Sequence, residues 1–251
     1  MSRIGFIGTG HIAAPMARHL AAKGHEITVT RRNEAVSAAL ARDCGARVAE
    51  PQAVLDECDI VFLCRRPQHA EAGLAPLRFR ADHRIVSVMA GVPEATLRRL
   101  CAPAQGFVQT IPLGFVEEGG CPLAAYGDDA LLSALVAPEN PVVKVAEESA
   151  LGAFMAACVL VPGLLDLMAT AAGWLGARVG KDAGEFYVTQ LTSGFLHAMR
   201  KGGAGRLAAE RDALATDGTY SLQMVEALRA AGVPGQILAA LDAVEARMEK
   251  A

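Results

Sequence analysis

The stretch Arg3-Ile4-Gly5-Phe6-Ile7-Gly8-Thr9-Gly10-His11-Ile12-Ala13 decides the fold of this chain. Its apolar run at residues 3–7 predicts a buried strand, which continues into a G-x-G-x-x-A motif and then a helical pattern at residues 12–23. Gly8 permits a tight turn, Gly10 lets a pyrophosphate approach the backbone, and Ala13 lets the helix pack close to the strand. We therefore predict a dinucleotide-binding turn, whose contacts are Gly8, Thr9, Gly10, His11 and Ile12.

The rest of the first half continues the alternation of short apolar runs and helical patterns, which predicts β-α-β units around a parallel sheet. Further strands are expected at residues 26–30, 47–48, 59–64, 84–89, 106–111, 124–126 and 142–145. After about Glu147 the strand patterns disappear, and alanine, leucine and methionine dominate. We predict an α/β fold, with a doubly wound Rossmann domain at residues 1–148 and an all-α domain at residues 149–251.

The second half predicts a series of helices. Residues 149–174 are expected to form one long helix that is kinked at Pro162, and Asp182 is expected to cap the next helix. Three more helices are predicted at residues 205–213, 221–231 and 234–250. Residues 151–165 carry no charge but are too few to span a membrane comfortably. We expect this run to be buried against the body of the protein or a second subunit.

Composition argues against several classes of protein. The 251 residues are 52% hydrophobic with a formal net charge of −3, so a large core is available and no basic face for nucleic acid is expected. The six cysteines form no C-x-x-C pair, and the six histidines show no H-x-x-x-H spacing, so we expect reduced thiols and no metal site. The N-terminus enters the first strand directly. A cytoplasmic protein without a membrane span is expected.

The end of the second strand selects the cofactor. An NAD site usually has an acidic residue there, which holds the ribose hydroxyls. This chain instead has Val29-Thr30-Arg31-Arg32-Asn33, and a guanidinium pairs well with a 2′-phosphate. The sequence therefore favours NADP(H) over NAD(H), with Arg31 and Arg32 as the phosphate contacts.

Three motifs of the first half resemble those of one enzyme family. They lie at residues 4–12 (I-G-F-I-G-T-G-H-I), 62–68 (F-L-C-R-R-P-Q) and 85–92 (I-V-S-V-M-A-G-V). The tail, residues 216–244, adds a glycine turn, a helix, Ala-Gly-Val and a final helix. This pattern resembles the pyrroline-5-carboxylate reductase family over nearly the whole chain. Arg66 stands where that family has lysine, and His11 where it usually has asparagine.

The resemblance implies NAD(P)H-dependent reduction of a cyclic imine, an activity best known in proline biosynthesis. It also implies that the helical domain binds substrate and interlocks with a second subunit, which gives a homodimer or a larger homo-oligomer. The nicotinamide is expected beyond the strand ends of the Rossmann sheet. Further cofactor contacts are therefore predicted at Arg66, Pro67, Ala90 and Gly91.

The substrate-binding turn departs from the family pattern. The usual Ser-Pro-Gly-Gly-x-Thr reads Ala-Thr-Asp-Gly-Thr-Tyr at residues 215–220, so Tyr220 occupies the position of the usual threonine. Asp217 places a negative charge where backbone amides normally receive a carboxylate, which disfavours pyrroline-5-carboxylate itself. Tyr220 and Thr219 are the predicted catalytic residues, as donors to the imine nitrogen.

Two other functions remain open. A hydroxyacid dehydrogenase of the related two-domain kind would carry a catalytic lysine on a helix of the second domain, but residues 151–179 contain none and Lys181 comes too late. An NADP-binding protein without catalysis, acting as a sensor or partner, is favoured by the loss of family hydroxyl groups: residues 158–164 read C-V-L-V-P-G-L where the family has Ser-Gly-Ser-Gly-Pro-Ala-Tyr. NADPH oxidation with a panel of cyclic imines separates this second possibility from a reductase.

Overall fold

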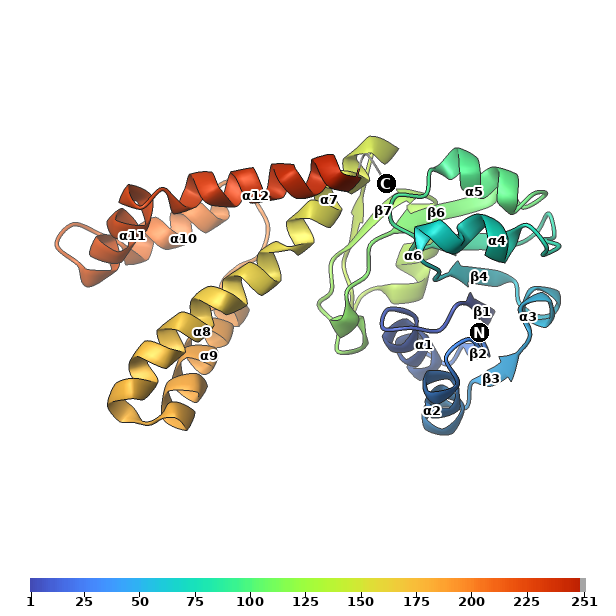
Figure 1. Cartoon of the computed structure of the whole chain (residues 1–251), viewed down its shortest axis with the longest axis horizontal. Coiled ribbons are helices and arrows are strands. Elements are labelled where there is room, and N and C mark those ends of the chain that lie inside the picture. Colours follow the sequence, from blue (N-terminus) through green and yellow to red (C-terminus); the bar gives the residue numbers. More distant parts are fainter. Residues whose placement is uncertain (249–251) are drawn as a thin grey trace. The chain divides into compact units, whose positions relative to one another are not determined.

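The computed structural model describes residues 1–248 and forms two compact units, Met1–Met155 and Ala156–Arg247 (Figure 1). Within the described residues, one sheet of eight strands lies in the first unit, in the order β3-β2-β1-β4-β5-β6-β7-β8. The strands are β1 (Arg3–Ile7), β2 (Glu26–Thr30), β3 (Arg47–Ala49), β4 (Ile60–Leu63), β5 (Arg84–Ser87), β6 (Gly106–Thr110), β7 (Leu123–Gly127) and β8 (Val142–Lys144).

The sheet has the topology of a doubly wound Rossmann fold. Its paired strands are parallel except for β6 and β7, which run antiparallel. The strand order reverses between β1 and β4, because β2 and β3 continue on one side of β1 while β5 and β6 continue on the other side of β4. The predicted fold class is confirmed. A reversal of this kind leaves a crevice at the carboxyl ends of the strands.

Helices cover both faces of the sheet (Figure 1). They are α1 (Ala13–Ala22), α2 (Glu34–Cys44), α3 (Pro51–Glu57), α4 (Ala70–Leu74), α5 (Glu94–Leu100) and α6 (Asp129–Val136). Side chains alternate between the faces, so Phe6 and Phe62 stack at 4.7 Å in the core under α1, α2 and α6. Ile7 and Leu63 belong to the opposite core, under α3, α4 and α5. This burial fixes the ends of β1 and β4 beside each other.

The second half is helical, as predicted, but its first helix is broken. Its helices are α7 (Leu151–Cys158), α8 (Leu160–Val179), α9 (Lys181–Ala198), α10 (Arg206–Leu214), α11 (Tyr220–Ala230) and α12 (Val233–Met248). The single helix predicted over residues 149–174 was wrong, because Pro162 disfavours continuous helix back to Cys158 and therefore lies in the first turn of α8. Asp182 was predicted to cap α9, but the cap residue is Gly180. Asp182 lies in the first turn of that helix.

Small residues bring α8 and α9 into close contact. A Cβ atom at Gly184 would lie 2.6 Å from the backbone nitrogen of Gly176 and 2.7 Å from the carbonyl oxygen of Ala172. Elsewhere these two helices expose large apolar side chains, with Trp174 61% and Phe186 70% exposed. By length and composition, the segment Glu148–Val179 also meets the criteria for crossing a membrane. A helix that packs on a second subunit can have the same composition, so length and composition alone do not distinguish a membrane span from a subunit interface.

We predict that Gly184→Ala destabilises the helical unit by about 1–3 kcal/mol, because the added methyl group overlaps the backbone of α8. Gly194→Ala is the matched control in α9, since the nearest atom to its new Cβ lies 3.9 Å away. That variant should be neutral or gain about 0.5–1 kcal/mol from helix propensity. Urea unfolding followed by circular dichroism measures both, and equal effects would contradict the close packing of the two helices.

Candidate cofactor site

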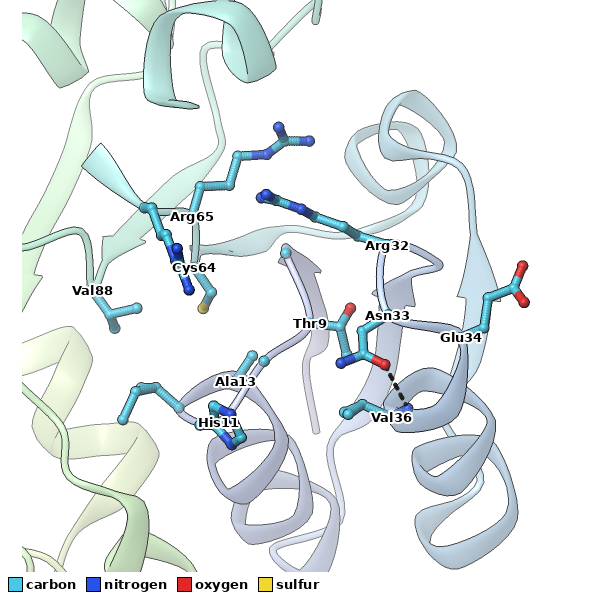
Figure 2. A pocket seen from close by; sticks show the side chains of 14 residues that line it. Thr9, His11, Ala13, Arg32, Asn33, Glu34, Val36, Cys64, Arg65 and Val88 are labelled. Atoms are coloured by element: carbon cyan, nitrogen blue, oxygen red, sulfur yellow. Dashed lines mark hydrogen bonds between the residues drawn. The ribbon is translucent and has the colours of Figure 1, made fainter. Parts of the chain in front are cut away.

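A cavity of about 660 Å³ lies at the carboxyl ends of β1, β2 and β4, where the strand order reverses (Figure 2). Predicted cofactor residues that line it are Gly8, Thr9, Gly10, His11, Ile12, Arg32 and Arg66. Lining residues that sequence reasoning did not assign to the site include Glu34, Val36, Cys64, Arg65 and Val88. The cavity lies wholly within the first unit.

The glycine turn after β1 is held against the ends of β2 and β4. Gly8 has φ +107°, and a Cβ atom there would lie 2.9 Å from the carbonyl carbon of Cys64. The Gly8 amide donates to the Thr30 hydroxyl at 2.9 Å, and the Thr9 hydroxyl donates to the Thr30 carbonyl oxygen. The Thr9 side chain therefore supports the turn, and only the backbone of Thr9 is left to contact a ligand.

The start of α1 offers the groups that a pyrophosphate requires. A Cβ atom at Gly10 would meet no atom within 4 Å, so ligand atoms can approach its backbone. No side chain caps this helix, whose first backbone bond joins the Ala14 amide to the Gly10 carbonyl at 3.0 Å. The N–H groups of a first helical turn lack partners within the helix and carry the positive end of its dipole. These residues fit a dinucleotide phosphate bridge.

Positive charge gathers on the β2 and β4 side of the cavity. Figure 2 shows the Arg32 side chain extending toward Arg65, while Glu34 points away from both. Among the described residues, neither arginine forms an ion pair with a carboxylate. The Nε atom of Arg65 is buried without a hydrogen-bond partner. Burial, and then the charge of Arg32, lower the pKa of Arg65. A phosphate would satisfy these groups.

A neutral thiol and a capped loop form other parts of the wall. Burial raises the pKa of Cys64 well above its usual range, so this sulfur stays protonated at neutral pH. Asn33 caps α2 by accepting a hydrogen bond from the Val36 amide at 3.3 Å. Because Asn33 directly follows Arg32, this cap holds the loop that carries the arginine. Within residues 1–248, no three His, Cys, Asp or Glu side chains gather to hold a metal ion.

Four predicted cofactor residues do not line this cavity: Arg31, Pro67, Ala90 and Gly91. Arg31 is exposed and precedes Arg32, whose side chain lines the cavity. Pro67 begins a 3-10 turn after β4, and Ala90 and Gly91 form a turn after β5, where Gly91 has φ +79°. All three follow carboxyl ends of strands. Their predicted contact with a nicotinamide stays a prediction.

The two predicted catalytic residues lie at the start of α11 in the second unit. Thr219 is the helix cap: its hydroxyl accepts from the Leu222 amide at 3.2 Å and donates to the Thr216 carbonyl at 2.7 Å. A hydroxyl has one proton to donate, so that of Thr219 is already in use. The Tyr220 side chain is 92% exposed. Of the two, Tyr220 is the one available as a donor.

We predict that Gly8→Ala and Gly10→Ala separate stability from binding. Gly8→Ala should lower the free energy of unfolding by about 1–3 kcal/mol, because its positive φ and the Cys64 carbonyl both oppose a Cβ. Gly10→Ala should fold normally but weaken NADP⁺ binding about tenfold or more, because the methyl group takes space needed by the pyrophosphate. Thermal unfolding and calorimetry measure the two effects, and unimpaired NADP⁺ binding by Gly10→Ala would contradict the assigned turn.

Comparison with known proteins agrees with this site. Residues 3–91 match the family model described as NADP oxidoreductase, coenzyme F420-dependent. An uncharacterized oxidoreductase of Shewanella frigidimarina (strain NCIMB 400) is 37% identical over 65 residues, which make up 26% of this chain and 22% of that protein. The matched part thus spans about a fifth of this curated relative.

Solved structures resemble the whole chain. Pyrroline-5-carboxylate reductase of Streptococcus pyogenes superposes with a TM-score of 0.83 at 20% identity, covering 100% of this chain and 99% of that one. The Plasmodium falciparum pyrroline carboxylate reductase, solved with NADP bound, gives 0.82 at 13% identity with 99% and 97% covered. An imine reductase from Pseudomonas sp. gives 0.63 at 16%, with 98% and 92% covered. The predicted resemblance is confirmed: over its whole length the chain has the fold of the pyrroline-5-carboxylate reductases.

Proposed function

We propose that this chain is an NADPH-dependent reductase of a cyclic imine. One observation carries the proposal: Arg32 and Arg65, which form no ion pair within residues 1–248, line a cavity whose other wall is a glycine turn and a helix start that no described side chain caps. That arrangement fits a dinucleotide with a third phosphate on its adenosine. The full-length likeness to pyrroline-5-carboxylate reductases and an imine reductase supports the choice of a carbon–nitrogen double bond as the group reduced.

Each part of the cavity has one task in this proposal. Backbone N–H groups at Gly10 and the start of α1 bind the pyrophosphate, and Arg32 binds the 2′-phosphate. The neutral Cys64 thiol adds no charge that would oppose these anions. NADPH, when bound, supplies the hydride for the imine carbon. The protein then has to orient the substrate and supply a proton to its nitrogen.

Tyr220 is the group that we assign to the imine nitrogen. Its exposed phenol has an O–H to donate, whereas the Thr219 hydroxyl is committed to the cap of α11. Asp217 lies in the same turn and disfavours a carboxylate at that position. A neutral cyclic imine is therefore the preferred substrate over pyrroline-5-carboxylate.

We further propose that the enzyme acts in the cytoplasm as a homodimer or larger homo-oligomer. Support comes from α8 and α9, which expose Leu165, Trp174, Phe186 and Tyr187 to more than half of their full extent. An apolar surface of this kind needs a partner to bury it. We propose a second copy of this chain as that partner, because the resemblance to the pyrroline-5-carboxylate reductases implies helical domains that interlock between subunits.

We predict that Arg32→Ala raises the KM for NADPH about tenfold or more while changing the KM for NADH little, because only NADPH carries the 2′-phosphate. Arg31→Ala is the matched control: it removes the same charge from the same loop but from a side chain that does not line the cavity. Steady-state NADPH and NADH oxidation measures both variants. An equal change for the two cofactors in Arg32→Ala would contradict the assigned phosphate contact.

We predict that Tyr220→Phe lowers kcat for imine reduction about 10²-fold or more while leaving NADPH affinity unchanged, because it removes only the phenolic proton donor. The wild-type chain should oxidise NADPH with neutral cyclic imines such as 1-pyrroline faster than with pyrroline-5-carboxylate. NADPH binding without turnover across such a panel would instead support the non-catalytic alternative. Normal kcat in Tyr220→Phe would remove this tyrosine from the mechanism.

A further inference from the structure

The guanidinium of Arg65 packs against a glycine of the neighbouring helix α4. Arg65 follows β4 and Cys64, and its guanidinium lies directly over Gly73 of α4. A Cβ atom at Gly73 would fall 2.5 Å from Cζ and 2.8 Å from Nε of Arg65, so any larger residue would displace the guanidinium. Gly73 is buried and Arg65 is half-buried. The absence of a side chain at residue 73 thus makes a notch that holds a cation at the wall of the cavity.

The arginine in this notch lacks a compensating anion. Its Nε is buried without a hydrogen-bond partner, and it forms no ion pair within the described residues. A second cation of the cavity wall, Arg32, extends toward it, and burial and then the charge of Arg32 lower the pKa of Arg65 (Figure 2). Burying a charged group is unfavourable unless a partner is present, and two like charges add to the cost. A dianion between the two guanidinium groups would relieve both effects.

We propose that Arg65, held in the Gly73 notch, is a second ligand of the 2′-phosphate and determines the preference for NADPH together with Arg32. The inference rests on the proposed function, because it assigns a further residue to the same cofactor. Arg32 follows β2 and Arg65 follows β4, so a phosphate bound by both guanidinium groups would bridge the two sides of the crevice. Arg66, the exposed neighbour at the position of the family's lysine, is not required for this arrangement.

Nucleotide fragments isolate the phosphate contact from catalysis. We would titrate the purified full-length chain with 2′,5′-ADP and with 5′-AMP, which differ by the 2′-phosphate alone. Arg65→Met removes the charge but keeps an unbranched side chain in the notch. It should weaken 2′,5′-ADP about tenfold or more and 5′-AMP little. Arg78→Ala, which removes an exposed arginine elsewhere in the first unit, should change neither affinity.

The notch itself is tested by Gly73→Ala, which keeps the arginine but leaves its guanidinium no room. This variant should also weaken 2′,5′-ADP, and it should have no further effect in the Arg65→Met background, because both changes remove one contact. If Arg65→Met does not fold, Arg65→Lys serves instead: it keeps the charge but loses the planar fork, so it should bind 2′,5′-ADP more weakly than the wild-type chain does while 5′-AMP changes little.

The outcomes separate this inference from the function on which it rests. Wild-type chain that prefers 2′,5′-ADP, together with an Arg65→Met variant that keeps the full preference, would overturn the role of Arg65 and leave the NADPH assignment intact. Wild-type chain without any preference would overturn both. If Gly73→Ala and Arg65→Met weaken 2′,5′-ADP binding additively, Gly73 does not act by positioning Arg65, and the proposed role of the notch is wrong.

Discussion

The geometry of the cofactor cavity follows from how closely the glycine turn after β1 approaches the end of β4. Gly8 lies so near the Cys64 carbonyl, and at so positive a φ, that only glycine meets both demands. This approach places the start of α1 opposite the residues that follow β4. Cys64 and Arg65, which follow β4, therefore line the same cavity as the glycine turn. The hydroxyl of Thr30 then fixes the turn from the β2 side.

The site combines a tightly packed scaffold with unsatisfied polar groups. Below the turn, Phe6 and Phe62 stack in a closed apolar core that holds β1 and β4 in register. Above it, the helix start has no cap and Arg65 has a buried donor without an acceptor. Buried polar groups in folded proteins are almost always paired. Their concentration at one edge of the sheet is what links this fold to the binding of a phosphorylated cofactor.

Sequence patterns predicted the elements that depend on local chemistry. The five-residue strands β1 and β2 were predicted with their bounds, because β1 is an apolar run that ends in glycine and β2 is a run of β-branched residues that ends at two arginines. The short helices α4, α5 and α6 were not predicted, since five to eight residues show little periodicity. For α6 a signal existed, because Asp128 caps it by accepting from the Leu131 amide at 2.9 Å. The break before Pro162 was placed too late, because proline acts on the turn that precedes it.

In the candidate site, too, features set by neighbouring residues could be predicted, and features set by the folded domain could not. The glycine motif and Arg32 could be predicted, since strand, turn and helix follow one another along the chain. Arg65 could not, because its significance comes from Arg32, which lies far earlier in the chain, and from Gly73, whose contact with the guanidinium depends on how α4 folds back after β4. Both Arg31 and Arg32 were predicted as phosphate contacts, and that Arg32 lines the cavity while Arg31 does not depends on the backbone of the loop, which Asn33 joins to α2 as its cap. Neither signal is visible in residue order alone.

We propose that this cavity binds a nicotinamide nucleotide and distinguishes the 2′-phosphate. Calorimetric titration of the unmodified chain with NADP⁺ and with NAD⁺ tests it most directly, since neither substrate nor turnover is needed. We expect saturable binding of NADP⁺ that is about tenfold or more tighter than that of NAD⁺. Equal affinity for the two nucleotides, or no binding of either at millimolar concentration, would contradict it.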